Sequence, residues 1–218
     1  MRADIKNPAI VMMHPDERSL LEIELGKDKT MLEWGSGGST LYFSNFVKEI
    51  CSFEHTTEWY EKVSQQIKEH DIKNIDYNHI PSDLEFKKPQ GHRRSDYKGT
   101  PAKYFRTYID AVEKYDKSKF DVILVDGRAR LYCAIKALPY LKDDGYLYMH
   151  DFFGRRQYHD VFDFYDLVSA VKYTPQTMVK LKKKTKQDML DYSFNKNVKT
   201  IEEIAEILDR DPDNFEWK

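Results

Sequence analysis

The sequence has few cysteines, no long apolar run and no excess of charge of one sign. Its two cysteines, Cys51 and Cys133, lie in apolar stretches, which predicts reduced core residues rather than a disulfide. No stretch approaches the roughly 20 apolar residues that span a bilayer, and the N-terminus lacks the apolar core of a signal peptide, so we expect a cytoplasmic protein without a membrane span. The formal net charge of −2 argues against nucleic acid as a partner.

What the sequence does contain is enough apolar material for a globular core. Its 218 residues, 40% hydrophobic and 14% aromatic, fit one sizeable domain. We expect this domain over residues 1–185, with an inserted polar flap over 84–100, and a charged tail over 186–218. The tail contains one helical segment, Ile201–Leu208, that either packs on the domain or serves self-association in a homodimer.

The chain is organised around a short apolar strand that ends in a glycine-rich turn. Residues 31–34 predict the strand, 35–38 the turn and 39–47 an amphipathic helix. Gly35 and Gly37 allow positive φ angles and let the backbone approach a ligand closely. Such a turn after a parallel strand is where open α/β sheets bind nucleotide-like cofactors.

The residues that open this helix narrow the choice of cofactor. Ser39 or Thr40 can cap the helix, whose free N–H groups favour a negatively charged group. An NAD-binding turn would need a third glycine where Thr40 stands. The pattern Glu33-x-Gly35-x-Gly37 instead resembles the first motif of class I S-adenosylmethionine (SAM) methyltransferases.

The resemblance extends over roughly residues 15–185 and implies how SAM is held. It implies that the glycine loop wraps the amino-acid end of SAM, with Glu33 near the ammonium group. Glu54 ends the next predicted strand, 19 residues after Gly35, where a carboxylate can accept both ribose hydroxyls. Ser82 and Asp83 follow the third strand, where this class often contacts adenine. The residues expected to bind the cofactor are Glu33, Gly35, Ser36, Gly37, Ser39, Thr40, Glu54, Ser82 and Asp83.

Strands and helices alternate along the chain. We predict strands at 31–34, 49–54, 75–80, 120–126 and 146–149, a terminal pair of strands at 170–173 and 178–181, and helices at 17–25, 39–47, 57–70, 101–115, 131–141 and 158–167. This alternation implies a parallel sheet with right-handed crossovers and helices on both faces. The terminal pair completes the seven-stranded, mostly parallel, Rossmann-like α/β fold of class I methyltransferases.

Polar residues end two strands that we expect to be neighbours. Asp126 ends the strand at 120–126, and His150 and Asp151 follow the strand at 146–149, so all three fall at the ligand-binding edge. Methyl transfer to a hydroxyl needs an aligned nucleophile and a base. With an unperturbed pKa near ~6.5, His150 suits the role of base, and Asp151 either orients it or acts itself. We expect these three residues to be catalytic, with a structural histidine as the alternative.

Some O-methyltransferases of this class place acidic residues after the same two strands to bind Mg²⁺, which holds a substrate oxygen. Asp126 and Asp151 match that arrangement in part. Mg²⁺ prefers oxygen ligands, so the histidine beside them argues against it. We therefore do not expect a magnesium site on Asp126 and Asp151, but the sequence does not exclude one.

The residues at the ends of these two strands predict the class of acceptor. The Asn/Asp-Pro-Pro-aromatic motif of methyltransferases that act on nucleic-acid bases is absent, and residues 126–130 stand in its place, which points to a hydroxyl acceptor. The Val-Asp-Gly and His-Asp strand ends also resemble a family that O-methylates glucuronic acid on plant xylan, which implies a sugar or glycan. Arginines then either bind a carboxylate or phosphate of the acceptor or are ordinary surface residues. They are Arg128, Arg130, Arg155 and, in the flap, Arg94.

Three other functions stay open. An NAD-dependent oxidoreductase is disfavoured by Thr40 and by the lack of a second nucleotide-binding half, and tight NADH binding without SAM binding would indicate it. A non-catalytic scaffold would act through the tail and flap and would keep its function after His150→Ala and Asp151→Ala. A metal-dependent O-methyltransferase of another small molecule is the third.

Overall fold

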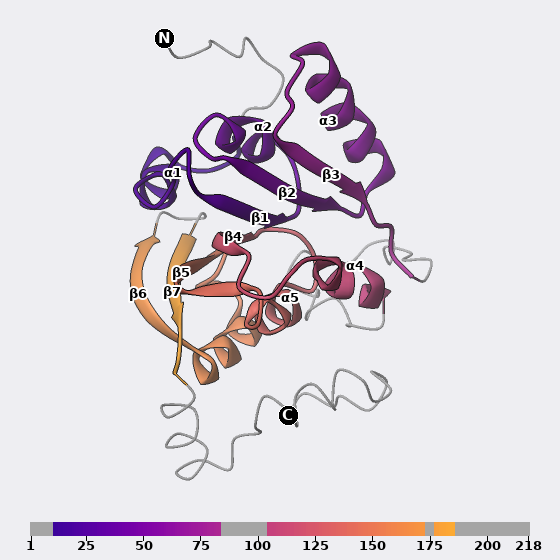
Figure 1. The fold of residues 1–218 in the computed structure, drawn as a ribbon. Coiled ribbons are helices and arrows are strands. Elements are labelled where there is room, and N and C mark those ends of the chain that lie inside the picture. Colours follow the sequence, from indigo (N-terminus) through magenta and orange to yellow (C-terminus); the bar gives the residue numbers. More distant parts are fainter. Residues whose placement is uncertain (1–10, 84–103, 173–176, 186–218) are drawn as a thin grey trace.

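The computed structural model describes residues 11–83, 104–172 and 177–185 (Figure 1). The expected flap over 84–100 with Arg94, and the expected tail over 186–218, lie outside the described residues. No helix in the described ranges is long and apolar enough to cross a membrane.

A single seven-stranded sheet with the order β3-β2-β1-β4-β5-β7-β6 lies at the centre of the molecule. Neighbours from β3 through β5 pair in parallel, whereas β7 is antiparallel to both β5 and β6. This confirms the mostly parallel sheet with a closing pair of strands. The strands are β1 (Thr30–Trp34), β2 (Glu49–Glu54), β3 (Ile75–His79), β4 (Phe120–Val125), β5 (Leu141–His150), β6 (Tyr165–Lys172) and β7 (Thr177–Lys183).

Helices cover both faces of the sheet, as expected. Because successive side chains of a strand point to opposite faces, Met31 packs with the core that contains Leu21 of α1 and Phe43 of α2, and Leu32 packs with the core that contains Tyr108 of α4. Every residue of β4 is buried, as a strand covered on both faces requires. The helices are α1 (Pro15–Glu22), α2 (Gly38–Ser44), α3 (Thr57–Glu69), α4 (Arg106–Asp110), α5 (Arg130–Ala137) and the 3-10 helices η3 (Ala111–Lys114) and η4 (Arg156–Asp163).

Two of the predicted elements in the second half end or begin elsewhere. The predicted helix at 158–167 is the 3-10 helix η4, which ends at Asp163, and β6 already begins at Tyr165. β6 is the edge strand and most of its residues are exposed, so it carries little apolar alternation. Residues 143–145 belong to β5, whose pairing with β4 is irregular at this point.

The sheet places its crevice between β1 and β4. The chain runs outward from β1 to β3 and then returns to form β4 on the other side of β1. Such a reversal opens a crevice at the carboxyl ends of the two strands, where ligands of open α/β sheets bind. In the core beside these strands, Cys51 and Cys133 are both buried and free, as predicted.

Candidate functional site

Two glycines let the turns after β1 and β4 touch at the crevice. Gly35 has a φ of 94°, and a Cβ there would stand 2.4 Å from the backbone nitrogen of Gly127. A Cβ on Gly127 would in turn meet the Tyr108 hydroxyl at 2.1 Å. The backbone N–H groups of Asp126 and Gly127 both donate to the Trp34 carbonyl, at 2.8 and 2.7 Å. The crevice therefore needs glycine at both positions.

Glu33 lies under the glycine loop and not along its open side. Its carboxylate has no exposed surface and accepts hydrogen bonds from Ser39 Oγ (2.5 Å), Thr40 Oγ1 (2.5 Å) and Ser52 Oγ (2.7 Å). Burial raises the pKa of Glu33 to about 7, and the three hydroxyls oppose that rise. This differs from the contact with a cofactor ammonium that the family resemblance implied, because the carboxylate here supports the loop from below.

Thr40 takes part in the cap of α2 as expected, although Gly37 and not Ser39 or Thr40 is the N-cap residue. The helix begins at Gly38, so Ser39 and Thr40 stand within its first turn. Thr40 Oγ1 accepts the Gly37 N–H at 3.0 Å while it donates to Glu33. Ser39 and Thr40 therefore join the loop to the buried carboxylate and do not line the crevice with their hydroxyls.

Glu54 stands at the carboxyl end of β2 and fixes the glycine loop from the side. One carboxylate oxygen accepts from the Ser36 N–H (3.0 Å) and Ser36 Oγ (3.1 Å), and the other from the N–H groups of His55 (2.9 Å) and Thr56 (2.7 Å). Burial would raise the pKa of Glu54, but the contacts with His55, Thr56 and Ser36 outweigh it and lower the pKa. All four lone-pair sites are in use, so a ribose hydroxyl would have to replace one donor. The Ser36 hydroxyl is the donor that can rotate away.

Two aromatic residues that the sequence did not single out also hold this loop. Trp59 Nε1 donates to the Ser36 carbonyl at 2.6 Å, and the Tyr77 hydroxyl lies 2.6 Å from Ser36 Oγ. Trp59 is 38% exposed. An indole N–H needs a hydrogen-bond acceptor when it is partly buried. This requirement was the signal in the sequence that could have pointed to Trp59.

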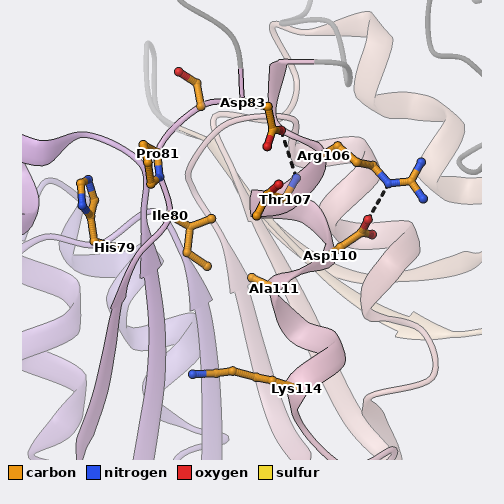
Figure 2. A pocket seen from close by; sticks show the side chains of 10 residues that line it. His79, Ile80, Pro81, Asp83, Arg106, Thr107, Asp110, Ala111 and Lys114 are labelled. Atoms are coloured by element: carbon orange, nitrogen blue, oxygen red, sulfur yellow. Dashed lines mark hydrogen bonds and ion pairs between the residues drawn. The ribbon is translucent and has the colours of Figure 1, made fainter.

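Ser82 and Asp83 lie beside a groove between the end of β3 and α4 (Figure 2). The Asp83 carboxylate accepts the Thr107 N–H at 3.0 Å, and so holds the start of α4 against this loop. Both residues therefore stand where the sequence placed them, at the end of the third strand. The groove is lined by His79, Ile80, Pro81, Ser82, Asp83, Arg106, Thr107, Asp110, Ala111 and Lys114.

His150 lies between two carboxylates. Its Nδ1 is 2.9 Å from Asp126 Oδ1, and its Nε2 is 3.3 Å from Glu17 Oε2 of α1. Burial would lower the pKa of His150, but the hydrogen bonds to Asp126 and Glu17 outweigh it and raise the pKa to about 10. Both ring nitrogens therefore act as donors, and the imidazolium form is favoured at neutral pH. In the structure His150 thus balances the charge of neighbouring carboxylates. The sequence had instead suggested a free base with an ordinary pKa.

Asp126 and Asp151 differ in how they contact this histidine. Asp126 is its close partner, whereas the nearest Asp151 oxygen is 4.0 Å from Nδ1. Burial would raise the pKa of Asp126, but Arg130 and His150 outweigh it and lower the pKa. Asp151 has a φ of 55°, an unusual backbone conformation for a residue other than glycine, and its side chain is 30% exposed.

The arginines at this edge divide into a buried one and two accessible ones. Arg130 is 7% exposed, and its guanidinium donates to the carbonyls of Gly127 and His150 and contacts both aspartates. It therefore does not face an acceptor, contrary to the expectation. Arg155 is 39% exposed in its side chain and pairs with Asp151 at 2.8 Å, and Arg128 is half-buried on the turn after β4.

Asp126, His150 and Asp151 bring together ligand-type atoms within 4.8 Å of one another. Such a group of two carboxylates and an imidazole could hold a transition metal better than Mg²⁺. Arg130 and Arg155, however, already contact these carboxylates. The donor set therefore does not fit a divalent cation.

Of the comparisons with known proteins, the one with solved structures agrees with this fold. No family model matches the chain, and no curated protein matches its sequence. Among solved structures it is similar to a methyltransferase-like protein of Silicibacter pomeroyi DSS-3 (23% identity, TM-score 0.57, 84% of this chain and 95% of that one). It is also similar to tRNA (m1A58) methyltransferase TrmI of Aquifex aeolicus (12%, 0.57, 82% and 72%). A Streptococcus mutans protein described as a methyltransferase and solved with SAH is a third (14%, 0.53, 79% and 99%).

At these low identities the similarity establishes a Rossmann-like methyltransferase fold. It does not carry an activity, a cofactor or an acceptor over to this chain.

Proposed function

We propose that the protein is a SAM-dependent methyltransferase. The observation that carries the proposal is the reversal of strand order between β1 and β4, where the Gly35 turn meets Gly127 and the Glu54 carboxylate holds Ser36 at the end of the adjacent strand. A fold shared with structures named as methyltransferases supports it, one of them solved with SAH. The SAH of that structure is the product that SAM leaves after methyl transfer.

The residues around the crevice fit such a cofactor. Only glycine backbone fits where Gly35 meets Gly127, and this leaves the edge of the sheet open beside Ser36. Glu54 and Ser36 would hold the ribose, and Ser82 with Asp83 would face the adenine from the end of β3. When bound, SAM supplies an electrophilic methyl group on a sulfonium. Glu33 takes no direct part and keeps the loop in place through Ser39 and Thr40.

We propose that the acceptor is a hydroxyl of a sugar or glycan. Asp126, with a side chain 26% exposed, accepts the hydrogen bond of that hydroxyl and orients its oxygen toward the methyl group. Asp126 would take the hydroxyl proton and pass it to water. The bound sulfonium would supply the methyl group to the hydroxyl oxygen, and its carbon–sulfur bond would break with the electron pair left on sulfur. His150, held as an imidazolium by Glu17, balances the charge on Asp126 and is not itself the base.

An anionic group on the acceptor would meet Arg128 and Arg155. Both have exposed side-chain surface, and both stand on the turns that follow β4 and β5, as Asp126 and Asp151 do. A guanidinium binds a carboxylate in two parallel hydrogen bonds, so a uronic acid fits these positions better than a neutral sugar does.

The experiment is methyl transfer from methyl-labelled SAM to matched acceptors. We expect label on oligosaccharides that contain glucuronic acid and little on the same oligosaccharides with the carboxylate reduced. Label on bulk RNA instead would replace the glycan with nucleic acid as the acceptor. A protein that binds SAH but labels no acceptor class would favour the non-catalytic scaffold.

A further inference from the structure

We propose that Arg130 is the resident cation of the cluster at the ends of β4 and β5, and that it holds Asp126 and Asp151 in place of a divalent metal. The inference rests on the proposed methyl transfer for the use of the cluster, though not for its arrangement. Its consequence is that acceptor binding and methyl transfer at this site need no metal ion.

The guanidinium of Arg130 occupies the space between the two carboxylates. Its Nη2 lies 3.1 Å from Asp126 Oδ1 and 3.5 Å from Asp151 Oδ2. An ion that bridged Asp126 Oδ1 and Asp151 Oδ2 would have to displace this nitrogen, because Mg²⁺ binds its oxygen ligands at about 2.1 Å. The two cations exclude each other, both by space and by like charge in a poorly solvated site.

Arg130 cannot readily move aside to admit such an ion. Its side chain is 8% exposed, and two further guanidinium N–H groups are committed to the backbone. Nε donates to the Gly127 carbonyl at 2.9 Å, and Nη1 donates to the His150 carbonyl. Removing the guanidinium would leave these buried acceptors without partners. Arg130 thereby ties the end of β4 to the end of β5, a task that bridging metals perform elsewhere.

His150, the third of the ligand-type groups, also has partners already. His150 Nδ1 faces Asp126 at 2.9 Å and Nε2 faces Glu17 at 3.3 Å, so a metal would have to displace one of these carboxylates. Arg155 holds Asp151 from the other side at 2.8 Å. Glu17, Asp126 and Asp151 thus face Arg130, Arg155 and His150, and each of the three carboxylates already has a basic side chain as its partner.

The test is a titration of the EDTA-dialysed full-length protein with Mn²⁺, monitored by the electron paramagnetic resonance signal of the free ion. We expect no saturable binding to the wild type into the millimolar range. Arg130→Met should gain about tenfold or more in Mn²⁺ affinity, because two carboxylates and an imidazole then face one another without a cation. Arg130→Lys keeps the charge and should gain none. Arg128→Met, a neutral substitution two residues away, is the matched control and should also gain none.

Saturable micromolar binding of Mn²⁺ to the wild type that is lost in Asp126→Asn and Asp151→Asn would overturn the proposal. So would a folded Arg130→Met, checked by its thermal melt, that gains no affinity. If Arg130→Met does not fold, the wild-type titration decides alone. Failure of the proposed function would show as an absence of SAH binding or of methyl transfer. Neither absence changes the result of the Mn²⁺ titration, so the two failures can be distinguished.

Discussion

Gly35 is a residue at which a side chain is poorly tolerated. Its φ of 94° and the 2.4 Å approach to Gly127 both exclude a Cβ without movement of backbone. Gly154 offers the contrast, since a Cβ there would meet nothing within 4 Å. The comparison separates a glycine required by close packing from one that is not.

Gly35→Ala should destabilise the fold by about 3 kcal/mol or more, a fall of about 10 °C in the melting temperature, because backbone strain and overlap act together. It should also abolish SAH binding. Differential scanning calorimetry and an SAH titration measure both effects, with Gly154→Ala as the control that changes neither. An unchanged melting temperature in Gly35→Ala would refute the close packing of the two turns.

Glu54→Gln should weaken SAH binding by about tenfold or more, because a neutral amide replaces a carboxylate that orders Ser36 through charge-assisted hydrogen bonds. The stabilisation from this carboxylate is present above its unfolded pKa of 4.5 and is lost as the pH falls below that value, since its pKa in the fold is lowered. Calorimetric titration measures the affinity. Glu58→Gln, at an exposed position on α3, should leave it unchanged.

At the scale of elements, one ion-pair cluster joins α1 to the ends of β4 and β5. Glu17 of α1 reaches His150, 133 positions further along the chain, and His150 reaches Asp126. The sequence placed Asp126, His150 and Asp151 together, because strand ends meet at one edge of a parallel sheet. It could not place Glu17, since no local pattern tells which residue of a preceding helix will reach that edge.

His150 should stay protonated well above pH 8, and the stability of the fold should depend on it. Its pKa is about 10 in the fold and 6.5 for an unperturbed histidine, so its contribution is complete below pH 6.5 and is lost as the pH rises toward 10. The contribution is on the order of a few kcal/mol. NMR titration of the seven histidines should show one ring that does not titrate near neutrality and that disappears in His150→Gln.

Removal of one carboxylate partner provides a second check on this histidine. In Glu17→Gln the pKa of the same ring should fall, because one of its two carboxylate partners is gone. If His150 instead titrates near its ordinary value in the wild type, it is available as a base, and the role given to Asp126 fails.

The elements themselves show where sequence patterns are sufficient. The five parallel strands were predictable because burial on both faces selects continuous apolar runs, as in β4. β6 begins within a predicted helix because its exposed edge imposes no such pattern, and Val161 and Phe164 of the preceding turn keep a helical spacing. The place of Glu33 near the end of its strand was predictable, but its three hydroxyl partners come from two elements and only the fold assembles them.

At the scale of the whole molecule, the order of the strands decides where chemistry can occur. The reversal between β1 and β4 gathers the glycine loop, Glu54 and the Asp126 cluster at one edge, while the closing antiparallel pair β6–β7 covers the far side of β5. In the proposed function this edge binds SAM and works without a metal.

The most direct measurement is calorimetric titration of the EDTA-dialysed protein with SAH, with and without Mg²⁺. We predict micromolar binding of one SAH per chain, with the same affinity in both conditions. SAH binding that requires Mg²⁺ would contradict the proposal that Arg130 stands in place of a metal. An absence of SAH binding in both conditions would contradict the proposal that the protein is a SAM-dependent methyltransferase.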